Sequence, residues 1–321
     1  IRNGERRLIL GIFIDDGIIA ASYDEDIDEL IEFVKREFKI RVLDADCFVG
    51  LEINRRTDGT IHLSQMAYTR KILEKFKMSN ANSIATPAEG NLVATTEPAT
   101  NYPFREAVGS LMYLAVGTRP DISFAVGKCS RNLCEPRTSD VTAVKRIFKY
   151  LCGTKNFGIE YKRTGTFALE GYSDSDYAGC LKTRRSTTGF VFNFGSGAVS
   201  WCSQLQKSVV TSTTEAEYVA AAQSVKELVW LRRLASNLHI NCDSIYLHID
   251  NQSAMRLVES GENQKRTKHV DVKYHFIREK FERGLFKLGH VSTENQVADI
   301  LTKPLSRVKF EKFRNLMGLS Q

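Results

Sequence analysis

The start of the chain carries apolar runs and an apolar periodicity that predict a hairpin followed by a helix. Residues 8–14 and 18–21 are apolar and flank the acidic turn Asp15-Asp16-Gly17, which predicts two antiparallel strands. Over residues 24–38 the apolar positions recur at spacings of three and four. This spacing predicts an amphipathic helix with Asp24 as its cap.

The next stretch is expected to be mainly helical. Residues 79–102 are polar, contain two prolines and have no lasting periodicity, so we expect a loop or linker there. Residues 153–165 are expected to connect this stretch to the second half of the chain. The remaining expected elements are a hairpin of 48–53 with 61–63 around Asp58-Gly59, and helices at 65–78, 104–115, 122–132 and 140–151.

The second half alternates strand and helix signals. Residues 167–174 alternate apolar and polar positions and then give way to small polar residues, which predicts a strand that ends at Asp174. A last helix is expected to be capped by Thr293 and Gln296 and closed by Pro304. The other expected elements are strands at 189–194, 198–203, 244–249 and 285–291, helices at 214–238, 251–259 and 270–283, and an amphipathic tail at 310–319.

The composition is typical of a folded protein and bears on its partners and its cellular environment. Of the 321 residues, 42% are apolar and 26% are charged, which is ordinary for a folded protein. The net charge of +7 suits a polyanionic partner, although many soluble proteins are equally basic. Seven scattered cysteines without paired Cys-x-x-Cys clusters predict reduced thiols in an intracellular protein. No apolar run approaches the roughly 20 residues of a membrane span, so no membrane partner is expected. Because the chain begins at Ile1 rather than Met, we expect a fragment of a longer polyprotein.

Four acids lie where predicted strands end or predicted helices begin. Asp174 and Asp250 end strands, while Glu217 and Asp299 lie near helix starts. Carboxylates that converge in this way suit a hard cation such as Mg²⁺. Near Glu217, a capping box of Ser212 with Glu215 would leave Glu217 free, whereas a box of Thr214 with Glu217 would make it structural.

The sequence around these acids resembles that of the ribonuclease H domain of copia-type LTR-retrotransposon Pol polyproteins. The opening hairpin is similar to the aromatic-x-Asp-Asp hairpin of reverse transcriptase palms, with Phe13 where Tyr is usual. The runs that carry the ribonuclease H resemblance are Gly-Tyr-Ser-Asp-x-Asp at 171–176, Arg-Arg-Ser-Thr-x-Gly at 184–189, Thr-Glu-Ala-Glu-Tyr at 214–218, Asp-Asn-Gln-Ser-Ala at 250–254, Arg-Thr-Lys-His at 266–269 and Ala-Asp-x-Leu-Thr-Lys at 298–303.

The resemblance implies an α+β palm remnant and a helical thumb/connection, followed by an α/β ribonuclease H-like domain with a five-stranded mixed sheet. The expected boundaries are 1–78 for the palm remnant, 79–165 for the thumb/connection, 166–305 for the ribonuclease H-like domain and 306–321 for a C-terminal tail.

The resemblance also implies metal-dependent cleavage of the RNA strand in RNA–DNA hybrids. Two Mg²⁺ ions, with Mn²⁺ as an alternative, would be held by the catalytic acids Asp174, Glu217, Asp250 and Asp299. Asp174 would bridge both ions, and Asp299 would serve the second. The implied partners are RNA–DNA hybrid or other nucleic acid and the rest of the Pol polyprotein. The implied location is intracellular, in a cytoplasmic virus-like particle or the nucleus.

Other side chains are candidates for contact with nucleic acid. Asn251 and Gln252 follow a predicted metal ligand and are candidate contacts to 2′-hydroxyls, although both could equally cap a helix. Lys265, Arg266 and Lys268 belong to the densest basic cluster and are candidate phosphate contacts.

Three alternatives stay open at this point. Asp15 and Asp16 resemble polymerase residues, but the upstream palm and the fingers are missing, so polymerase activity of this chain alone is not expected. A transposase or integrase core would instead use Glu282 after Asp250. A remnant that binds nucleic acid without cleaving it is the third alternative.

Overall fold

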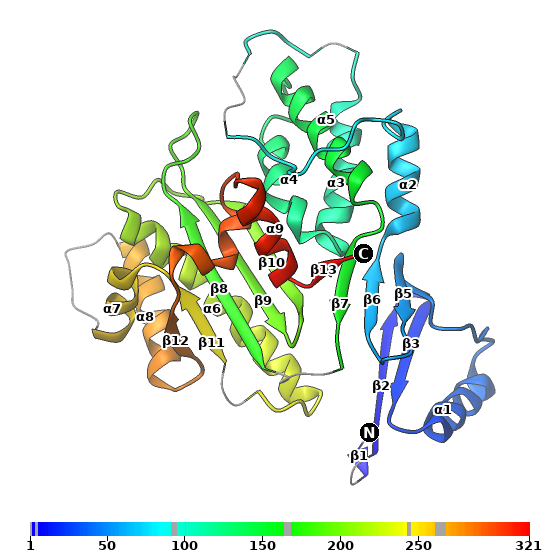
Figure 1. The fold of residues 1–321 in the computed structure, drawn as a ribbon. Helices are drawn as coiled ribbons and strands as arrows, with labels where there is room; N and C mark the ends of the chain where they lie inside the picture. The colour runs from blue at the N-terminus through cyan, green and yellow to red at the C-terminus, as the bar shows by residue number, and fades with distance from the viewer. Residues whose placement is uncertain are drawn as a thin grey trace.

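The computed structural model describes residues 2–3, 6–90, 95–99, 101–163, 168–242, 245–260 and 268–321. In these residues the strands form three sheets, two of them with five strands. Figure 1 shows the mixed sheet, the helical region and the N-terminal hairpin as neighbouring parts of the molecule. Within the described ranges every helix is too short or too polar to cross a lipid bilayer.

The N-terminal sheet is a three-stranded antiparallel unit that carries the acidic turn. β1 (Arg2–Asn3) pairs with β2 (Arg6–Phe13), which pairs with β3 (Asp16–Ala21), and α1 (Asp24–Glu37) packs on β3. The predicted hairpin is confirmed, but its turn is Ile14-Asp15, because Phe13 pairs with Asp16. Asp16 is therefore a strand residue. Ile14 adopts the left-handed region with a φ of 52°, a conformation that is unusual for a β-branched residue.

A second, antiparallel sheet joins distant parts of the chain. Its strand order is β13-β7-β6-β5-β4. We expected residues 153–165 to be only a connection, but they contain β7. A four-residue run has little local signal, and this strand depends on pairing with β6 and with the end of the chain. The bounds are β4 (Cys47–Phe48), β5 (Leu51–Arg55), β6 (Ile61–Ser64), β7 (Gly158–Tyr161) and β13 (Leu319–Ser320).

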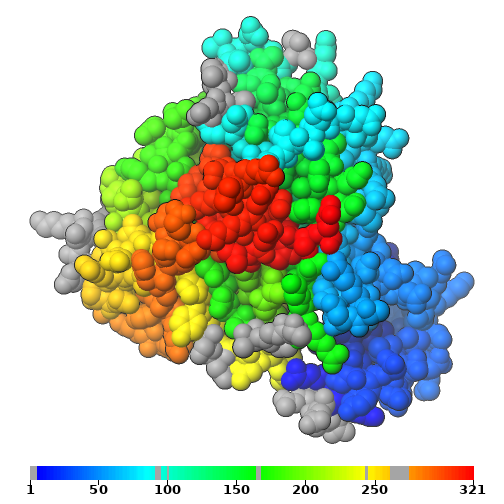
Figure 2. Space-filling view, viewed as in Figure 1, coloured from blue at the N-terminus to red at the C-terminus, as the bar shows by residue number. Residues whose placement is uncertain are grey.

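The helical region has its own apolar core. Leu111, Ile147 and Phe148 are fully buried in it. The C-terminal helix α9 (Arg307–Leu316) adds Phe310 and Phe313 to the same core, and Figure 2 shows this segment, in red, beside the green and cyan helical region. The other elements here are α2 (Met66–Lys75), α3 (Phe104–Gly117), η1 (Pro120–Ile122), α4 (Ser123–Ser130) and α5 (Thr138–Gly153).

The mixed five-stranded sheet that the resemblance implied is confirmed. Its order is β10-β9-β8-β11-β12, and β8, β11 and β12 run parallel, while β9 and β10 are antiparallel to their neighbours. α6 packs against β8 and β9, and α4 packs against β10 (Figure 1). The bounds are β8 (Leu169–Asp176), β9 (Thr187–Phe194), β10 (Gly197–Leu205), α6 (Thr213–Asn237), β11 (Tyr246–Ile249), α7 (Gln252–Ser260), α8 (Lys268–Glu282) and β12 (Lys287–His290).

The expected last helix before Pro304 is wrong. The chain forms two short 3₁₀ helices there, η2 (Thr293–Asn295) and η3 (Val297–Leu301). Gln296 explains the break, because its side-chain oxygen accepts a hydrogen bond from the Ala298 amide at 3.3 Å and its Nε2 donates to the Ser173 carbonyl at 2.9 Å. This side chain caps only the second short helix and ties it to β8.

Candidate metal and active site

Two of the candidate acids meet because their strands are parallel neighbours. Tyr172 of β8 pairs with His248 of β11. Asp174 and Asp250 each lie two residues beyond this pair in the direction of the strands. Parallel strands end at the same edge of a sheet, so both carboxylates reach that edge together.

Glu217 approaches the same edge from α6. Ser212 caps this helix by accepting a hydrogen bond from the Glu215 amide at 3.1 Å, and Glu215 accepts one from the Thr211 amide at 2.8 Å. Ser212 is therefore the cap, as predicted, but the Glu215 side chain bonds Thr211 instead of the Ser212 amide of a capping box. Glu217 instead turns toward the sheet, where its Oε1 accepts a hydrogen bond from the Ser175 amide at 3.3 Å.

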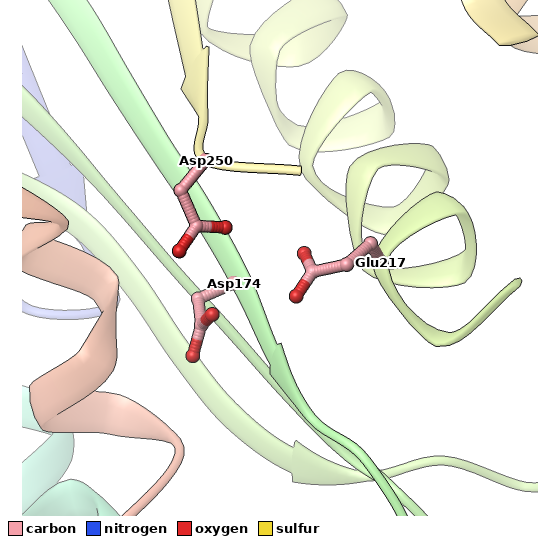
Figure 3. A group of neighbouring side chains, drawn as sticks. All are labelled: Asp174, Glu217 and Asp250. Carbon is pink, nitrogen blue, oxygen red and sulfur yellow. The ribbon is translucent and has the colours of Figure 1, made fainter. Parts of the chain in front are cut away.

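The three acids form one compact group. One oxygen each of Asp174, Glu217 and Asp250 lies within 4.8 Å of the others. Figure 3 shows the three carboxylates pointing toward one another from β8, α6 and the end of β11. Asp174 and Glu217 are buried, and Asp250 is half-buried. Among the residues that the structure describes, these three acids are the one cluster of acids, histidines or cysteines that is spaced closely enough to hold a metal ion.

Asp299 lies next to this group but outside it. It belongs to η3, and its side chain is 0% exposed. Its Oδ1 lies 2.8 Å from the Lys303 Nζ, and its Oδ2 lies 3.0 Å from the Lys309 Nζ. The Lys303 ammonium is also 3.9 Å from Asp174 Oδ2. Asp299, the fourth predicted ligand, is therefore connected to Asp174 by the ammonium group of Lys303, which lies close to both carboxylates.

Burial and mutual repulsion perturb the acids strongly. Burial raises the pKa of Asp174 to about 7, with Asp299 and Asp250 adding to the shift and Lys303 opposing it. Burial, followed by the charges of Asp174 and Asp250, raises the pKa of Glu217 well above its ordinary value. Burial lowers the pKa of Lys303, but the surrounding carboxylates outweigh this effect and raise it. Carboxylic acids whose pKa values are raised in this way, as those of Asp174 and Glu217 are, are typical of functional sites.

Hydroxyls hold two of the acids in place. Thr302 is fully buried, and its hydroxyl donates to Asp174 Oδ2. The Thr293 hydroxyl donates to Asp250 Oδ2 at 3.0 Å. The sequence reasoning missed Thr302 and Lys303, although both lie in the 298–303 run that carried the resemblance.

A buried amide fixes the elements around the acids. The Nε2 of Gln206 lies 3.2 Å from Ser175 Oγ, 3.1 Å from Thr188 Oγ1 and 3.0 Å from the Ala216 carbonyl. These partners belong to β8, β9 and α6, so one side chain connects the three elements. The sequence reasoning missed Gln206 as well, because its neighbours are distant in the chain.

The candidate nucleic-acid contacts have separate outcomes. Asn251 caps α7, because its Oδ1 accepts a hydrogen bond from the Ala254 amide at 2.9 Å, which was the alternative left open. Gln252 is the exposed first residue of that helix. Lys265 and Arg266 lie outside the described residues, and so does the side chain of Lys268.

The acids of the alternative functions lie elsewhere. Asp15 and Asp16 are exposed on the N-terminal hairpin, which belongs to a different sheet from the acid group. Glu282, the acid of the transposase or integrase alternative, is at the end of α8, where its Oε1 lies 2.6 Å from Arg278 Nε. It does not belong to the group of Asp174, Glu217 and Asp250.

Comparison with known proteins identifies relatives over nearly the whole chain. Residues 1–90 match the family model described as reverse transcriptase (RNA-dependent DNA polymerase). The chain is 40% identical to the retrovirus-related Pol polyprotein from transposon TNT 1-94 of Nicotiana tabacum, over 97% of this chain and 24% of the relative. It is 36% identical to the Pol polyprotein from transposon RE2 of Arabidopsis thaliana, over 99% of this chain and 22% of the relative. The chain thus spans about a quarter of the length of these relatives.

A shorter relative is covered almost completely. An uncharacterized mitochondrial protein of Arabidopsis thaliana is 34% identical over 70% of this chain and 94% of its own length. Among solved structures, RNase H1 from the archaeon Halobacterium salinarum NRC-1 is similar at 18% identity over 42% of this chain and 94% of that chain, with a TM-score of 0.30. LC11-RNase H1 in complex with an RNA/DNA hybrid is similar at 19% identity over 42% and 93% of the two chains, with a TM-score of 0.32.

Proposed function

Because the chain belongs to the Pol polyprotein family of copia-type retrotransposons, we propose that its acid group cleaves the RNA strand of RNA–DNA hybrids. The observation that carries this proposal is the convergence of Asp174 from β8, Asp250 just after β11, and Glu217 from α6. Hydrolysis of a phosphodiester at such a group needs a bound divalent cation.

The residues fit a divalent cation. Their ligand atoms are all carboxylate oxygens, which Mg²⁺ prefers and Mn²⁺ accepts. The Oε2 of Glu217 is buried and has no hydrogen-bond partner among the described residues, and a cation would satisfy it. A bound divalent cation supplies a lower pKa for an attacking water and stabilises charge on the scissile phosphate. Asp174, Glu217 and Asp250 would hold one ion, and Asp299 with Asp174 would hold a second.

The chain's own groups orient the acids. The hydroxyls of Thr302 and Thr293 and the amide of Ser175 donate hydrogen bonds to Asp174, Asp250 and Glu217, respectively. One oxygen each of Asp174, Glu217 and Asp250 lies within 4.8 Å of the others, so the supported carboxylates can share one cation. Such supporting bonds keep a site within the small tolerances that catalysis needs.

Contacts to the hybrid are assigned by position. Gln252, which is exposed and lies two residues after Asp250, would contact a 2′-hydroxyl, the group that distinguishes RNA from DNA. Lys265, Arg266 and Lys268 would bind phosphates of the hybrid. Asn251 is assigned to the helix cap rather than to substrate, on the strength of its bond to Ala254.

The N-terminal sheet is proposed to be the end of a reverse transcriptase palm. Asp15 and Asp16 would then serve polymerisation only when the rest of the Pol polyprotein completes the fold. The apolar side chains of Ile12, Ile14 and Phe33 are exposed on this hairpin and on α1, which supports packing against another part of the polyprotein. For this chain alone we expect no primer extension.

The test is a cleavage assay on a hybrid with separately labelled strands. We expect the purified chain with Mg²⁺ to cut the RNA strand and leave the DNA strand intact. Asp250→Asn keeps the shape but removes a ligand charge, so the rate should fall by more than the roughly 10–100-fold typical of losing a supporting group. The control is Asp28→Asn, an exposed acid on α1 that should leave the rate unchanged.

The alternatives give different results in the same assay. Tight binding of hybrid without cleavage would favour a remnant that only binds nucleic acid. Joining of duplex ends that depends on Glu282 would favour a transposase or integrase core.

A further inference from the structure

A lysine occupies the space between the fourth acid and the group of three. The Lys303 Nζ lies 2.8 Å from Asp299 Oδ1 and 3.9 Å from Asp174 Oδ2. The Lys309 Nζ, from α9, lies 3.0 Å from the other oxygen of Asp299. Each oxygen of this fully buried carboxylate therefore lies within ion-pair distance of an ammonium group, although neither contact has hydrogen-bond geometry. A buried carboxylate needs such a compensating charge.

The local chain geometry keeps this lysine in place. The Lys303 amide donates a hydrogen bond to the Asp299 carbonyl at 3.2 Å, so a backbone turn joins the two residues of the ion pair. Thr302, the preceding residue, donates its hydroxyl to Asp174. Two consecutive side chains thus contact Asp174 or its neighbour, one as a neutral donor and the other as a cation.

A second divalent ion would need the same space. Such an ion would be shared by Asp174 and Asp299, and the Lys303 ammonium lies between these two carboxylates. A monovalent and a divalent cation cannot occupy that space together, because their repulsion is strong at separations of a few ångströms. The Lys303 side chain is 34% exposed, so it is not sealed inside the protein.

We propose that Lys303 is a built-in cation of the acid site, and that a second divalent ion binds to Asp299 only by displacing it. This inference rests on the proposed function, because it concerns the same site. The first ion then binds to Asp174, Glu217 and Asp250 without moving a lysine, and the second ion binds more weakly. Lys303 sets the concentration of metal at which the site is filled.

The test is a titration of the whole chain with Mn²⁺, in which free ion is measured by electron paramagnetic resonance. We expect the unchanged protein to bind one ion tightly and a second at least about tenfold more weakly, because an ion pair must open first. Lys303→Met is nearly the same size but neutral and should reduce the ratio of the two dissociation constants by about tenfold or more. Lys303→Arg keeps the charge and should behave like the unchanged protein.

A matched control separates the position of the lysine from its charge. Lys71→Met removes one positive charge from an exposed site on α2, and it should leave both constants unchanged. If the unchanged protein binds two ions equally well, or if Lys303→Met leaves the ratio unchanged, the inference is overturned. These outcomes concern binding alone, so they are independent of whether the chain cuts a hybrid.

A measurement on the unchanged protein covers the case in which Lys303→Met does not fold. An amine-reactive label, quantified by mass spectrometry, should modify Lys303 slowly without metal and with one equivalent of Mn²⁺. Labelling should rise as the second ion binds, while labelling of Lys71 stays constant. Labelling of Lys303 that does not change with the second ion would contradict the proposal.

Discussion

Asp174 interacts electrostatically with the other charged groups of the site. It lies between Asp250 and Glu217 on one side and Lys303 on the other, and its hydroxyl donor is Thr302. Burial raises its pKa to about 7. In the absence of metal, a proton on this group therefore stabilises the folded chain.

The first prediction concerns pH and the stability of the metal-free chain. The pKa of Asp174 is higher in the folded chain than the ordinary value near 4 in the unfolded chain, so the folded chain binds more protons between these values. The stabilising contribution is complete below about pH 4 and is lost as the pH rises to about 7, with a slope of up to about 1.4 kcal/mol per pH unit. Glu217 changes stability in the same direction, because its pKa is also raised.

Urea unfolding in EDTA between pH 4 and 8 measures this slope. Asp174→Asn removes one titrating group and should flatten the curve, and Mg²⁺ should restore stability at pH 8. A metal-free stability that rises between pH 5 and 7 by an amount that Asp174→Asn abolishes would contradict the prediction.

The second prediction concerns Thr302. Thr302→Val keeps the shape but removes the hydroxyl that donates to Asp174. A lost hydrogen bond to a charged group costs about 1.5–3 kcal/mol, so we expect Mn²⁺ binding to weaken by about tenfold or more. Thr142→Val removes a comparable hydroxyl on the exposed face of α5 and should leave binding unchanged. Equal effects of the two substitutions would show that Thr302 has no special role.

At the scale of elements, the strands and helices with strong local patterns could be predicted, and those held by distant partners could not. The end of β11 just before Asp250 followed from an apolar run broken by polar residues. The predicted end of β8 at Asp174 is two residues short, because the strand continues through Asp176 by pairing with β9. The strand β7 was missed because its pairing partners, β6 and β13, lie far away in sequence. The helix expected before Pro304 was wrong because Gln296 bonds to β8 instead of continuing a helix.

The third prediction concerns the helix α9, which carries Lys309 to Asp299. Phe313 on this helix is 0% exposed, and Phe313→Ala should reduce the free energy of unfolding by about 3–5 kcal/mol. Val308→Ala on the same helix is the control, because Val308 is 79% exposed and its change should stay within about 0.5 kcal/mol. Denaturant titration of both variants measures the difference. Similar stabilities would mean that α9 does not pack into the helical core.

At the scale of the whole molecule, the mixed sheet and the helical region share a core. Val191, Ala198 and Ile300 are buried in the same cluster as the helices α3 and α5. The Trp201 indole on β10 donates to the Ala115 carbonyl of α3 at 2.8 Å. The acid group therefore lies on a sheet with helices on both faces. No local pattern indicated this packing, because its contacts join residues far apart in the chain.

The fourth prediction rests on this shared core. Residues 168–305 expressed alone would expose Val191, Ala198 and Ile300, which are buried in the whole chain. We expect this piece to bind the dye ANS and to unfold at a lower temperature than the 321-residue chain. Calorimetry and dye fluorescence on both proteins test the expectation. An excised piece as stable as the whole chain would show that the two regions are independent.

The proposed activity requires that Asp174, Glu217 and Asp250 together hold a divalent cation. Anomalous X-ray scattering from crystals of the chain grown with Mn²⁺ would locate such an ion. We predict an anomalous peak within coordinating distance of all three carboxylates, and its loss in Asp250→Asn. Well-ordered crystals with these side chains in place and no peak between them would contradict the proposed site.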